Sequence, residues 1–286
     1  MKILLFGAGG QLGWELQRTS PAGVDLDVVH HCDVDFRNEK SIKNSIIESN
    51  PDWIINAAAY TAVDKAESEE NLANQLNHLA VAQIARTVRE THKKLVHIST
   101  DFIFDGNHSV PYLPDSPANP HSVYGKTKLD GEIAIKQILQ EDFLIVRTAW
   151  LYSSHGNNFV KTMLRLMKER DALQVVADQI GTPTWANGLA QCIWKAVGKD
   201  ICGTLHWTDA GVASWYDFSV AIQEIALEFG ILEKPVPISS IPSIQYPTPA
   251  KRPSFSVLDK TETWQKIEII PVHWRVQLKN MMEELI

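Results

Sequence analysis

Short, nearly uninterrupted hydrophobic runs recur through the first half of the chain, and stretches with helical periodicity lie between them. The runs predict five β-strands, over residues 2–7, 25–30, 52–59, 94–100 and 142–148. The intervening stretches predict helices over residues 10–19, 38–49, 66–92 and 123–139. Strands that are apolar on both faces are typical of a parallel sheet with helices on both sides. The alternation therefore predicts an α/β fold, a doubly wound parallel sheet of the Rossmann type.

The pattern of hydrophobic and polar residues changes after about residue 150. Helical periodicity predicts further helices over residues 156–169, 185–198 and 214–229. The proline- and serine-rich stretch 230–256 excludes a long helix and predicts extended loops. We therefore expect one domain from residues 1–150 and a smaller α/β lobe formed mainly by residues 151–286. Part of the second segment is expected to return to the main sheet, as a strand from either 172–177 or 203–208.

Composition and charge exclude several classes of protein. The 286 residues are 44% hydrophobic and 21% charged, with a net charge of −7, so there is no basic excess for binding nucleic acid. The apolar run ILLF near the N-terminus is too short for a signal peptide, and no run approaches the roughly 20 apolar residues that span a membrane. The cysteines, Cys32, Cys192 and Cys202, are scattered without a Cys-x-x-Cys motif, which predicts a cytoplasmic protein without a disulfide framework or zinc site.

A glycine-rich turn follows the first predicted strand and opens the first predicted helix. Gly7, Gly10 and Gly13 recur at every third position, with Gly9 as an extra glycine. Such a turn lets the backbone approach a pyrophosphate closely, and the N–H groups of the helix start then face the phosphates. The residues 1–150 are therefore predicted to form a dinucleotide-binding domain.

The end of the second predicted strand does not decide between NADH and NADPH. His30 and His31 occupy the position at which an acidic residue would bind a ribose hydroxyl, and Asp33 and Asp35 come just after it. No cluster of arginines for a 2′-phosphate stands there either. We expect the two histidines to be surface residues.

Candidate catalytic residues follow the fourth predicted strand and begin the helix after it. Ser99, Thr100 and Asp101 stand at the carboxyl end of the strand, where doubly wound sheets bind ligands. Tyr124 and Lys128 are four residues apart and share one face of the predicted helix. An ammonium group near a phenol favours the phenolate, so we expect Lys128 to lower the pKa of Tyr124 from about 10. This pattern predicts proton transfer from Tyr124, with Thr100 bonded to the same carbonyl oxygen.

These features together resemble the extended short-chain dehydrogenase/reductase superfamily, and within it the dTDP-4-dehydrorhamnose reductase family. The resemblance covers nearly the whole chain and keeps the order of the motifs. The motifs are GQLGWELQR (10–18), NAAAYTAVDKAE (56–67), STDFIFDG (99–106), VYGKTKLDGE (123–132), RTAWLY (147–152), GNNFVKTMLRL (156–166) and YPTPAKRPSFSVLD (246–259). The resemblance implies reduction of the C4 ketone of dTDP-4-dehydro-L-rhamnose to dTDP-L-rhamnose with NADPH or NADH.

The resemblance also implies which residues bind the cofactor. The positions near the pyrophosphate would be Gly7, Gly10, Gln11 and Leu12, and those near the adenosine would be Asp35 and Phe36. The loop after the third strand would line the cofactor with Ala57, Ala58, Ala59, Tyr60 and Thr61. The three alanines fit such a place because larger side chains would block a dinucleotide.

For catalysis, the family likeness implies that Lys128 binds the nicotinamide ribose, Tyr124 delivers the proton and Thr100 tunes that hydrogen bond. The residues that match positions near the nucleotide-sugar substrate are Thr100, Asp101, Tyr124, Trp150 and Arg252. An indole offers a flat platform for a sugar or base, and an arginine suits a diphosphate.

One position departs from the family pattern. Some members dimerise through a divalent metal ion held by glutamates, and Glu15 matches one of these positions, whereas Asn187 stands at the second. An amide is a poorer ligand for Mg²⁺ than a carboxylate. We therefore expect no metal site, with Glu15 as the one candidate ligand, and either a monomer or a homodimer.

Two other functions remain open at this level. A non-catalytic regulatory subunit, like the β subunit of methionine adenosyltransferase, resembles the same family, but the set Thr100, Tyr124 and Lys128 favours an enzyme. Another sugar-nucleotide reductase, an epimerase or a dehydratase of the superfamily is the third reading. The absence of a glutamate directly after Asp101 disfavours dehydratase chemistry.

Overall fold

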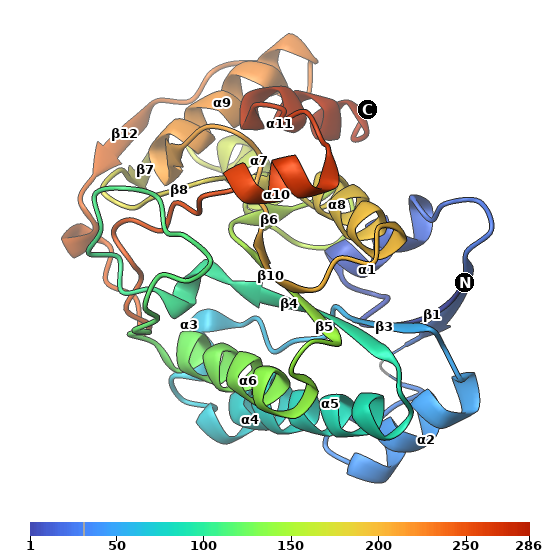
Figure 1. The fold of residues 1–286 in the computed structure, drawn as a ribbon. Coiled ribbons are helices and arrows are strands. Elements are labelled where there is room, and N and C mark those ends of the chain that lie inside the picture. Colours follow the sequence, from blue (N-terminus) through green and yellow to red (C-terminus); the bar gives the residue numbers. More distant parts are fainter. Residues whose placement is uncertain (31) are drawn as a thin grey trace.

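The computed structural model describes residues 1–30 and 32–286, and its centre is a six-stranded parallel sheet (Figure 1). The strands are β1 (Lys2–Phe6), β2 (Asp25–Val29), β3 (Trp53–Asn56), β4 (Lys94–Thr100), β5 (Phe143–Thr148) and β10 (Gly203–His206). Their order across the sheet is β10-β5-β4-β3-β1-β2. The five strand predictions and the doubly wound fold are confirmed. Of the two segments that could return, 203–208 supplies the sixth strand, whereas 172–177 does not join the sheet. The prediction about His31 lies outside the described residues.

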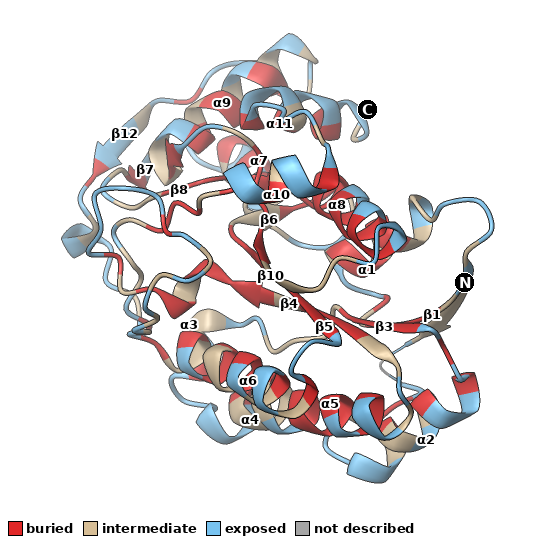
Figure 2. Cartoon of the chain, viewed as in Figure 1, coloured by how far each residue is buried: buried red, intermediate tan, exposed pale blue. Residues whose placement is uncertain are grey.

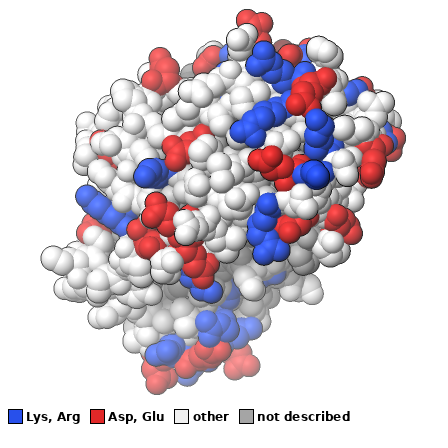
Figure 3. All heavy atoms as spheres, turned by 90° about the horizontal axis from the view of Figure 1, so that it is seen from below, with Lys and Arg blue, Asp and Glu red and all other residues white. Residues whose placement is uncertain are grey.

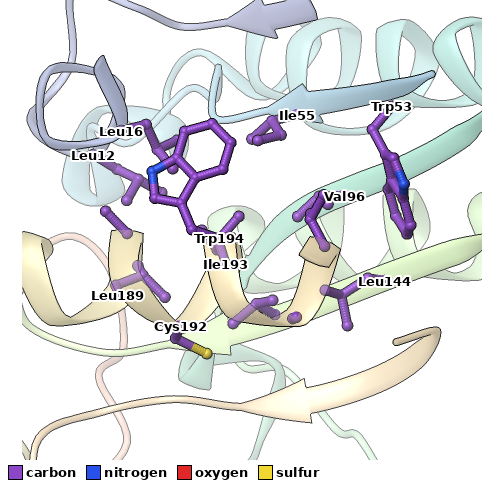
Figure 4. Packing of buried hydrophobic residues seen from close by; sticks show 14 of the residues in the cluster. Leu12, Leu16, Trp53, Ile55, Val96, Leu144, Leu189, Cys192, Ile193 and Trp194 are labelled. Carbon is purple, nitrogen blue, oxygen red and sulfur yellow. The ribbon is translucent and has the colours of Figure 1, made fainter. Parts of the chain in front are cut away.

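Helices cover both faces of the sheet because its strands are apolar on both sides (Figure 2). One face carries α2 (Glu39–Ser49), α5 (Ala80–Glu90) and α6 (Val123–Leu139), and the other carries α1 (Gln11–Arg18), α8 (Ala186–Gly198) and α10 (Thr261–Ile267). On this second face, Trp194 of α8 points towards Leu16 of α1 and Ile55 of β3 (Figure 4). The two layers hold the carboxyl ends of the strands in a fixed arrangement.

The long helix predicted over 66–92 is present over residues 70–90, as α4 (Glu70–Asn74), a π-helical turn η1 (Gln75–Leu79) and α5 in direct succession. A separate short helix, α3 (Val63–Ala66), precedes it. Within the π turn, Asn77 is fully buried, and its side chain bonds both the N–H and the C=O of Tyr60, at 2.8 and 3.1 Å. The extra residue of a π turn lets a polar side chain enter the packing without ending the helix. Asn77 thereby fixes the loop that follows β3.

The rest of the second segment forms a separate cluster of buried residues. Its elements are α7 (Phe159–Glu169), α9 (Trp215–Glu228), α11 (Trp274–Glu283) and the parallel pair β7 (Leu173–Val176) and β12 (Ile238–Ile241). The shorter elements are η2 (Asp101–Ile103), β6 (Leu151–Tyr152), β8 (Ile180–Gly181), β9 (Thr184–Trp185), β11 (Ala213–Ser214) and η3 (Ser243–Gln245). Because α8, β10 and α10 pack on the sheet instead, the division at residue 150 stays a prediction, with those three elements as the returning part.

Charges of both signs are interspersed on the face formed by α2, α5 and α6 (Figure 3). Ion pairs such as Lys43–Glu90, at 2.7 Å, join neighbouring helices there. Among the described residues, no helix combines the length and apolar character needed to cross a bilayer. The hollow in the molecule that concerns function lies elsewhere, at the carboxyl edge of the sheet.

Candidate active site

A cleft of about 1330 Å³ opens at the carboxyl ends of the strands, at the neighbouring strands β1 and β3, which are followed by helices on opposite faces of the sheet, α1 and α5 respectively. Doubly wound sheets bind their ligands at such a switch point. The predicted site residues that line it are Gly7, Gly10, Gln11, Leu12, Asp35, Phe36, Ala57, Ala58, Ala59, Thr61, Thr100, Asp101, Tyr124, Lys128, Trp150 and Arg252. Drug-sized ligands occupy about 300–1,000 Å³, so the cleft has room for two nucleotides.

The glycine turn requires residues without side chains. Gly7 has a φ of +84°, and a Cβ atom there would lie 2.5 Å from the backbone nitrogen of Ala58. A Cβ atom on Gly13 would lie 2.2 Å from the carbonyl oxygen of Gly7. These close approaches bring β1, the start of α1 and the loop after β3 together. The residues present fit a pyrophosphate at the N-terminus of α1.

Arg37 is a residue of the cleft that sequence reasoning missed. It lies two residues after Asp35, and its Nε donates to Asp35 Oδ1 at 2.9 Å. The hydrogen bonds from Arg37 lower the pKa of Asp35. His30 also lines this end of the cleft, so it is more than a plain surface residue. The sequence predicted no cluster of arginines at this end of the cleft. The structure has one guanidinium there, that of Arg37.

Tyr60 is the one predicted site residue whose side chain lies outside the cleft. Its hydroxyl donates to Glu69 at 2.6 Å, and this hydrogen bond to a carboxylate raises the pKa of Tyr60 to about 12. Its backbone still shapes the loop, because Asn77 holds both of its polar groups. The backbone and the side chain of Tyr60 therefore have different roles.

The three candidate catalytic residues meet in the cleft. Thr100 ends β4 and donates to Asp101 Oδ1 at 3.0 Å, and Tyr124 stands in the first turn of α6. The N-cap Ser122 accepts from the N–H of Gly125 at 3.1 Å, as its place before the helix predicts. A Cβ atom on Gly125 would lie 2.2 Å from the carbonyl oxygen of Phe102, so glycine lets α6 approach η2. This contact fixes the phenol beside the end of β4.

The electrostatics of Tyr124 differ from the sequence-based expectation. Burial, followed by the charge of Asp101, raises the pKa of Tyr124 to about 12, while the hydroxyl of Thr100 acts in the opposite direction. The expected lowering by Lys128 is wrong for this structure, because the ammonium group is directed elsewhere. Nζ of Lys128 donates to the carbonyl oxygen of Ile98 at 2.6 Å. A phenol that stays protonated at neutral pH is nevertheless the form that a proton donor needs.

Two neighbours of Tyr124 also titrate abnormally. Burial lowers the pKa of Lys128 to about 8, against the opposing charge of Glu132. Burial raises the pKa of Asp101 to about 6, and its Oδ2 atom is buried without a hydrogen-bond partner in the protein. Strongly shifted groups that converge in a cleft are typical of functional sites.

The far end of the cleft has an aromatic wall. Trp150 stacks on Trp215, with ring centroids 3.6 Å apart and planes 7° from parallel. The backbone of Trp150 has a φ of +47°, and the absence of a side chain on Gly181 leaves room for the indole. Trp215 begins α9 and was not predicted as a site residue, since the pattern Ser214–Asp217 predicts a helix start but not which side chain enters a cleft.

Arg252 reaches the cleft from the proline-rich stretch. Its Nη2 atom donates to Asp64 Oδ2 at 2.7 Å, and Asp64 also accepts from the N–H of Ala250. The guanidinium is only partly exposed and borders the cleft.

Glu15 does not fit a metal ligand. It is fully buried, and its carboxylate accepts hydrogen bonds from Arg18 (2.8 and 3.1 Å), Ser153 (3.1 Å) and the amide of Asn187 (3.0 Å). Among the described residues there is no group of three or more His, Cys, Asp and Glu side chains that could hold a metal ion. These hydrogen bonds make Glu15 part of the packing between α1 and α8.

Comparison with known proteins gives a consistent result. The family model described as RmlD substrate binding domain matches residues 1–286. The dTDP-4-dehydrorhamnose reductases of Escherichia coli (strain K12) and Salmonella typhimurium are each 41% identical, with 100% of this chain and 98% of theirs aligned. Among solved structures, a dTDP-4-dehydrorhamnose reductase from Clostridium acetobutylicum superposes with a TM-score of 0.93 at 39% identity, covering 100% and 99% of the two chains. The enzyme of Bacillus anthracis in complex with NADP gives 0.92 at 33%, covering 99% of each. The chain belongs to the dTDP-4-dehydrorhamnose reductase family of NAD(P)-dependent oxidoreductases.

Proposed function

We propose that the protein reduces the C4 ketone of dTDP-4-dehydro-L-rhamnose to the hydroxyl of dTDP-L-rhamnose, the last step in the biosynthesis of that nucleotide sugar. The observation that carries the proposal is the convergence of Thr100, Tyr124 and Lys128 in the cleft that also contains the glycine turn. Full-length similarity to dTDP-4-dehydrorhamnose reductases supports the choice of substrate.

The cofactor is proposed to lie along the first half of the cleft. Gly7, Gly10, Gln11 and Leu12 would hold the pyrophosphate, the alanine loop would line the middle, and Lys128 would bind the nicotinamide ribose. A bound NADPH or NADH supplies the hydride that reduces the ketone carbon. Asp35 can accept a hydrogen bond from a ribose hydroxyl, whereas Arg37 can pair with a 2′-phosphate, so the pair suits both cofactors.

In the proposed reaction, Tyr124 gives its hydroxyl proton to the former carbonyl oxygen as negative charge develops there. Thr100, whose hydroxyl donates to Asp101 in the free protein, would donate to the same oxygen once substrate is bound. The stacked indoles of Trp150 and Trp215 offer a flat wall to the sugar or base, and Arg252 offers a guanidinium to the diphosphate.

The experiment that tests the proposal supplies the dTDP-4-keto sugar enzymatically and follows the loss of nicotinamide absorbance with NADPH and NADH in turn. Tyr124→Phe is expected to lower kcat at least about a hundredfold while cofactor affinity is kept. Tyr246→Phe, at an exposed tyrosine outside the cleft, is the matched control and should keep full activity. An unchanged kcat in Tyr124→Phe would remove this residue as the proton donor.

The findings favour this enzyme over a non-catalytic regulatory subunit, since the proposed catalytic residues are all present and lie together. We place the reaction in the cytoplasm because the three cysteines form no disulfide and the proposed cofactor is a cytoplasmic metabolite. A monomer or a homodimer is compatible with the proposed reaction, because every proposed catalytic residue comes from one chain.

A further inference from the structure

His97 lies behind Lys128, on the side away from the cleft opening. It is fully buried on β4, and its Nε2 atom is 3.3 Å from Nζ of Lys128. Its Nδ1 atom is 3.2 Å from Nδ2 of Asn56, which is the residue directly opposite on β3. None of the proposed catalytic steps uses His97 or Asn56, so the reason for this buried polar pair has to be sought in its contacts.

The hydrogen bonds around Asn56 determine which nitrogen of His97 carries the proton. The backbone N–H of Ala58 donates to Oδ1 of Asn56 at 3.2 Å, so the NH₂ group of that amide must face His97. Nδ1 of His97 then accepts, and in a neutral ring the proton has to be on Nε2. Burial, and then the charge of Lys128, hold the pKa of His97 well below its usual range, so the ring is neutral.

An N–H group therefore points at the nitrogen of Lys128. An ammonium group has three donors and no acceptor, whereas a neutral amine has a lone pair that can accept from Nε2–H. The contact stabilises the amine and disfavours the ammonium. The other groups around Nζ are the carbonyl oxygen of Ile98 and, one turn further along α6, Glu132. Glu132 favours the ammonium but is itself paired with Arg147 at 2.7 Å.

We propose that His97, with its tautomer fixed by Asn56, is a positioning residue that makes the amine form of Lys128 accessible near neutral pH. The inference rests on the proposed function for its catalytic meaning. After Tyr124 has given its proton to the substrate oxygen, the ammonium of Lys128 can return a proton to the phenolate through a bridging water molecule, since Nζ itself is directed to Ile98. An N–H bond of Lys128 breaks, the O–H bond of Tyr124 forms again, and solvent later protonates the amine. A lysine with an ordinary pKa would release that proton less readily.

The first test is spectroscopic and needs no substrate. Lysine labelled with ¹³C at Cε is titrated in the full-length protein, with Lys128→Met to assign the signal. Lys128 is expected to titrate near pH 8 in the wild type and about one pH unit higher in His97→Leu, the equivalent of one lost hydrogen bond. His97→Gln keeps an N–H donor and should restore the low value. Lys260, whose pKa burial also lowers to about 8, is an internal reference that should not move.

A matched variant and a second measurement separate this role from mere packing. Val96→Ala removes a buried side chain from the opposite face of the same strand and should leave the Lys128 titration unchanged. The ¹⁵N signals of wild-type His97 should show the Nε2–H tautomer. A Nδ1–H tautomer, an unmoved titration in His97→Leu, or an equal shift in His97→Gln would each overturn the proposal, and the tautomer can be read even if His97→Leu does not fold.

The second test links the titration to turnover. With the dTDP-4-keto sugar, kcat is measured as a function of pH. In His97→Leu the apparent pKa of the alkaline limb should rise by the same amount as the pKa of Lys128 from the titration, and KM for the sugar should change less than about twofold. A limb that stays in place although the Lys128 signal moves would overturn the proton-return step. Absence of reductase activity in every variant would instead contradict the proposed function and leave the result on Lys128 intact.

Discussion

At the scale of single residues, the buried carboxyl group of Asp101 lowers the stability of the fold while lying in the candidate active site. Its pKa of about 6 in the folded protein lies above the value of 3.8 for an exposed aspartate, because burial disfavours the carboxylate. Between these values the folded chain binds the proton more tightly than the unfolded chain, so stability falls as the pH rises through this window. The fold bears this cost at neutral pH to keep a carboxyl group beside Thr100.

Asp101→Asn is therefore expected to stabilise the protein at pH 7, by about 3 kcal/mol at most, while lowering turnover. The gain in the free energy of unfolding should shrink towards pH 4, where the wild-type carboxyl group is neutral as well. Denaturant unfolding at both pH values measures this. A gain of equal size at both would show that the charge of Asp101 is not the cause.

Arg37 provides a prediction about cofactor choice. Arg37→Ala should raise KM for NADPH about tenfold and leave KM for NADH within about twofold, because only NADPH carries a phosphate for the guanidinium. Arg165→Ala, at an exposed arginine of α7 that pairs with Glu169, is the control and should affect neither. Equal effects of Arg37→Ala on both cofactors would contradict a 2′-phosphate contact.

At the scale of elements, the packing of α6 on η2 decides where Tyr124 stands. Alanine normally stabilises a helix relative to glycine by about 1 kcal/mol. Gly125→Ala should do the opposite, since its Cβ would meet the Phe102 backbone at 2.2 Å, and it should lower kcat as well. Gly198→Ala on α8 meets no atom within 4 Å and should stabilise the protein. Thermal unfolding and turnover of the two variants provide the comparison, and similar effects would refute the packing argument.

The elements that local patterns determine were predictable. The predicted bounds of α6 agree with the structure, since Ser122 caps it and a run of prolines precedes it. The π turn over 75–79 was not predictable, because Asn77 is turned inward by partners on a loop and on α6 that are distant in sequence. The choice of 203–208 over 172–177 as the sixth strand likewise depends on which one reaches the edge beside β5.

The same distinction applies to the candidate site. Motif spacing predicted the glycine turn and the meeting of Thr100, Tyr124 and Lys128 in the cleft, because the carboxyl ends of parallel strands meet at one edge. The other predicted residues that line the cleft were implied by the family resemblance. Motif spacing could not predict in which direction individual side chains point. Tyr60 turns to Glu69, Lys128 turns to Ile98 and His97, and Trp215 arrives from a helix some sixty-five residues after its partner Trp150. Each of these depends on tertiary neighbours.

At the scale of the whole molecule, Glu15 joins the sheet-covering helices and the C-terminal end. Arg18 bonds Glu15 and also Glu284 at 2.9 Å, while Asn187 and Ser153 complete the set. Because these bonds use the carboxylate, we predict that EDTA leaves both turnover and the sedimentation coefficient unchanged, and that added Mg²⁺ alters neither. Loss of activity or of a dimer in EDTA, with recovery on adding Mg²⁺, would show that a metal ion does bind.

The lack of a side chain on Gly7 also constrains how the protein can be re-engineered. The backbone of Ala58, about fifty residues away in sequence, occupies the space that a Cβ atom on residue 7 would need. Because the clash is with backbone atoms, combinatorial libraries aimed at new nicotinamide analogues would have to keep glycine at residue 7. Varying residue 7 would mostly give variants that do not fold, so their activity could not be measured.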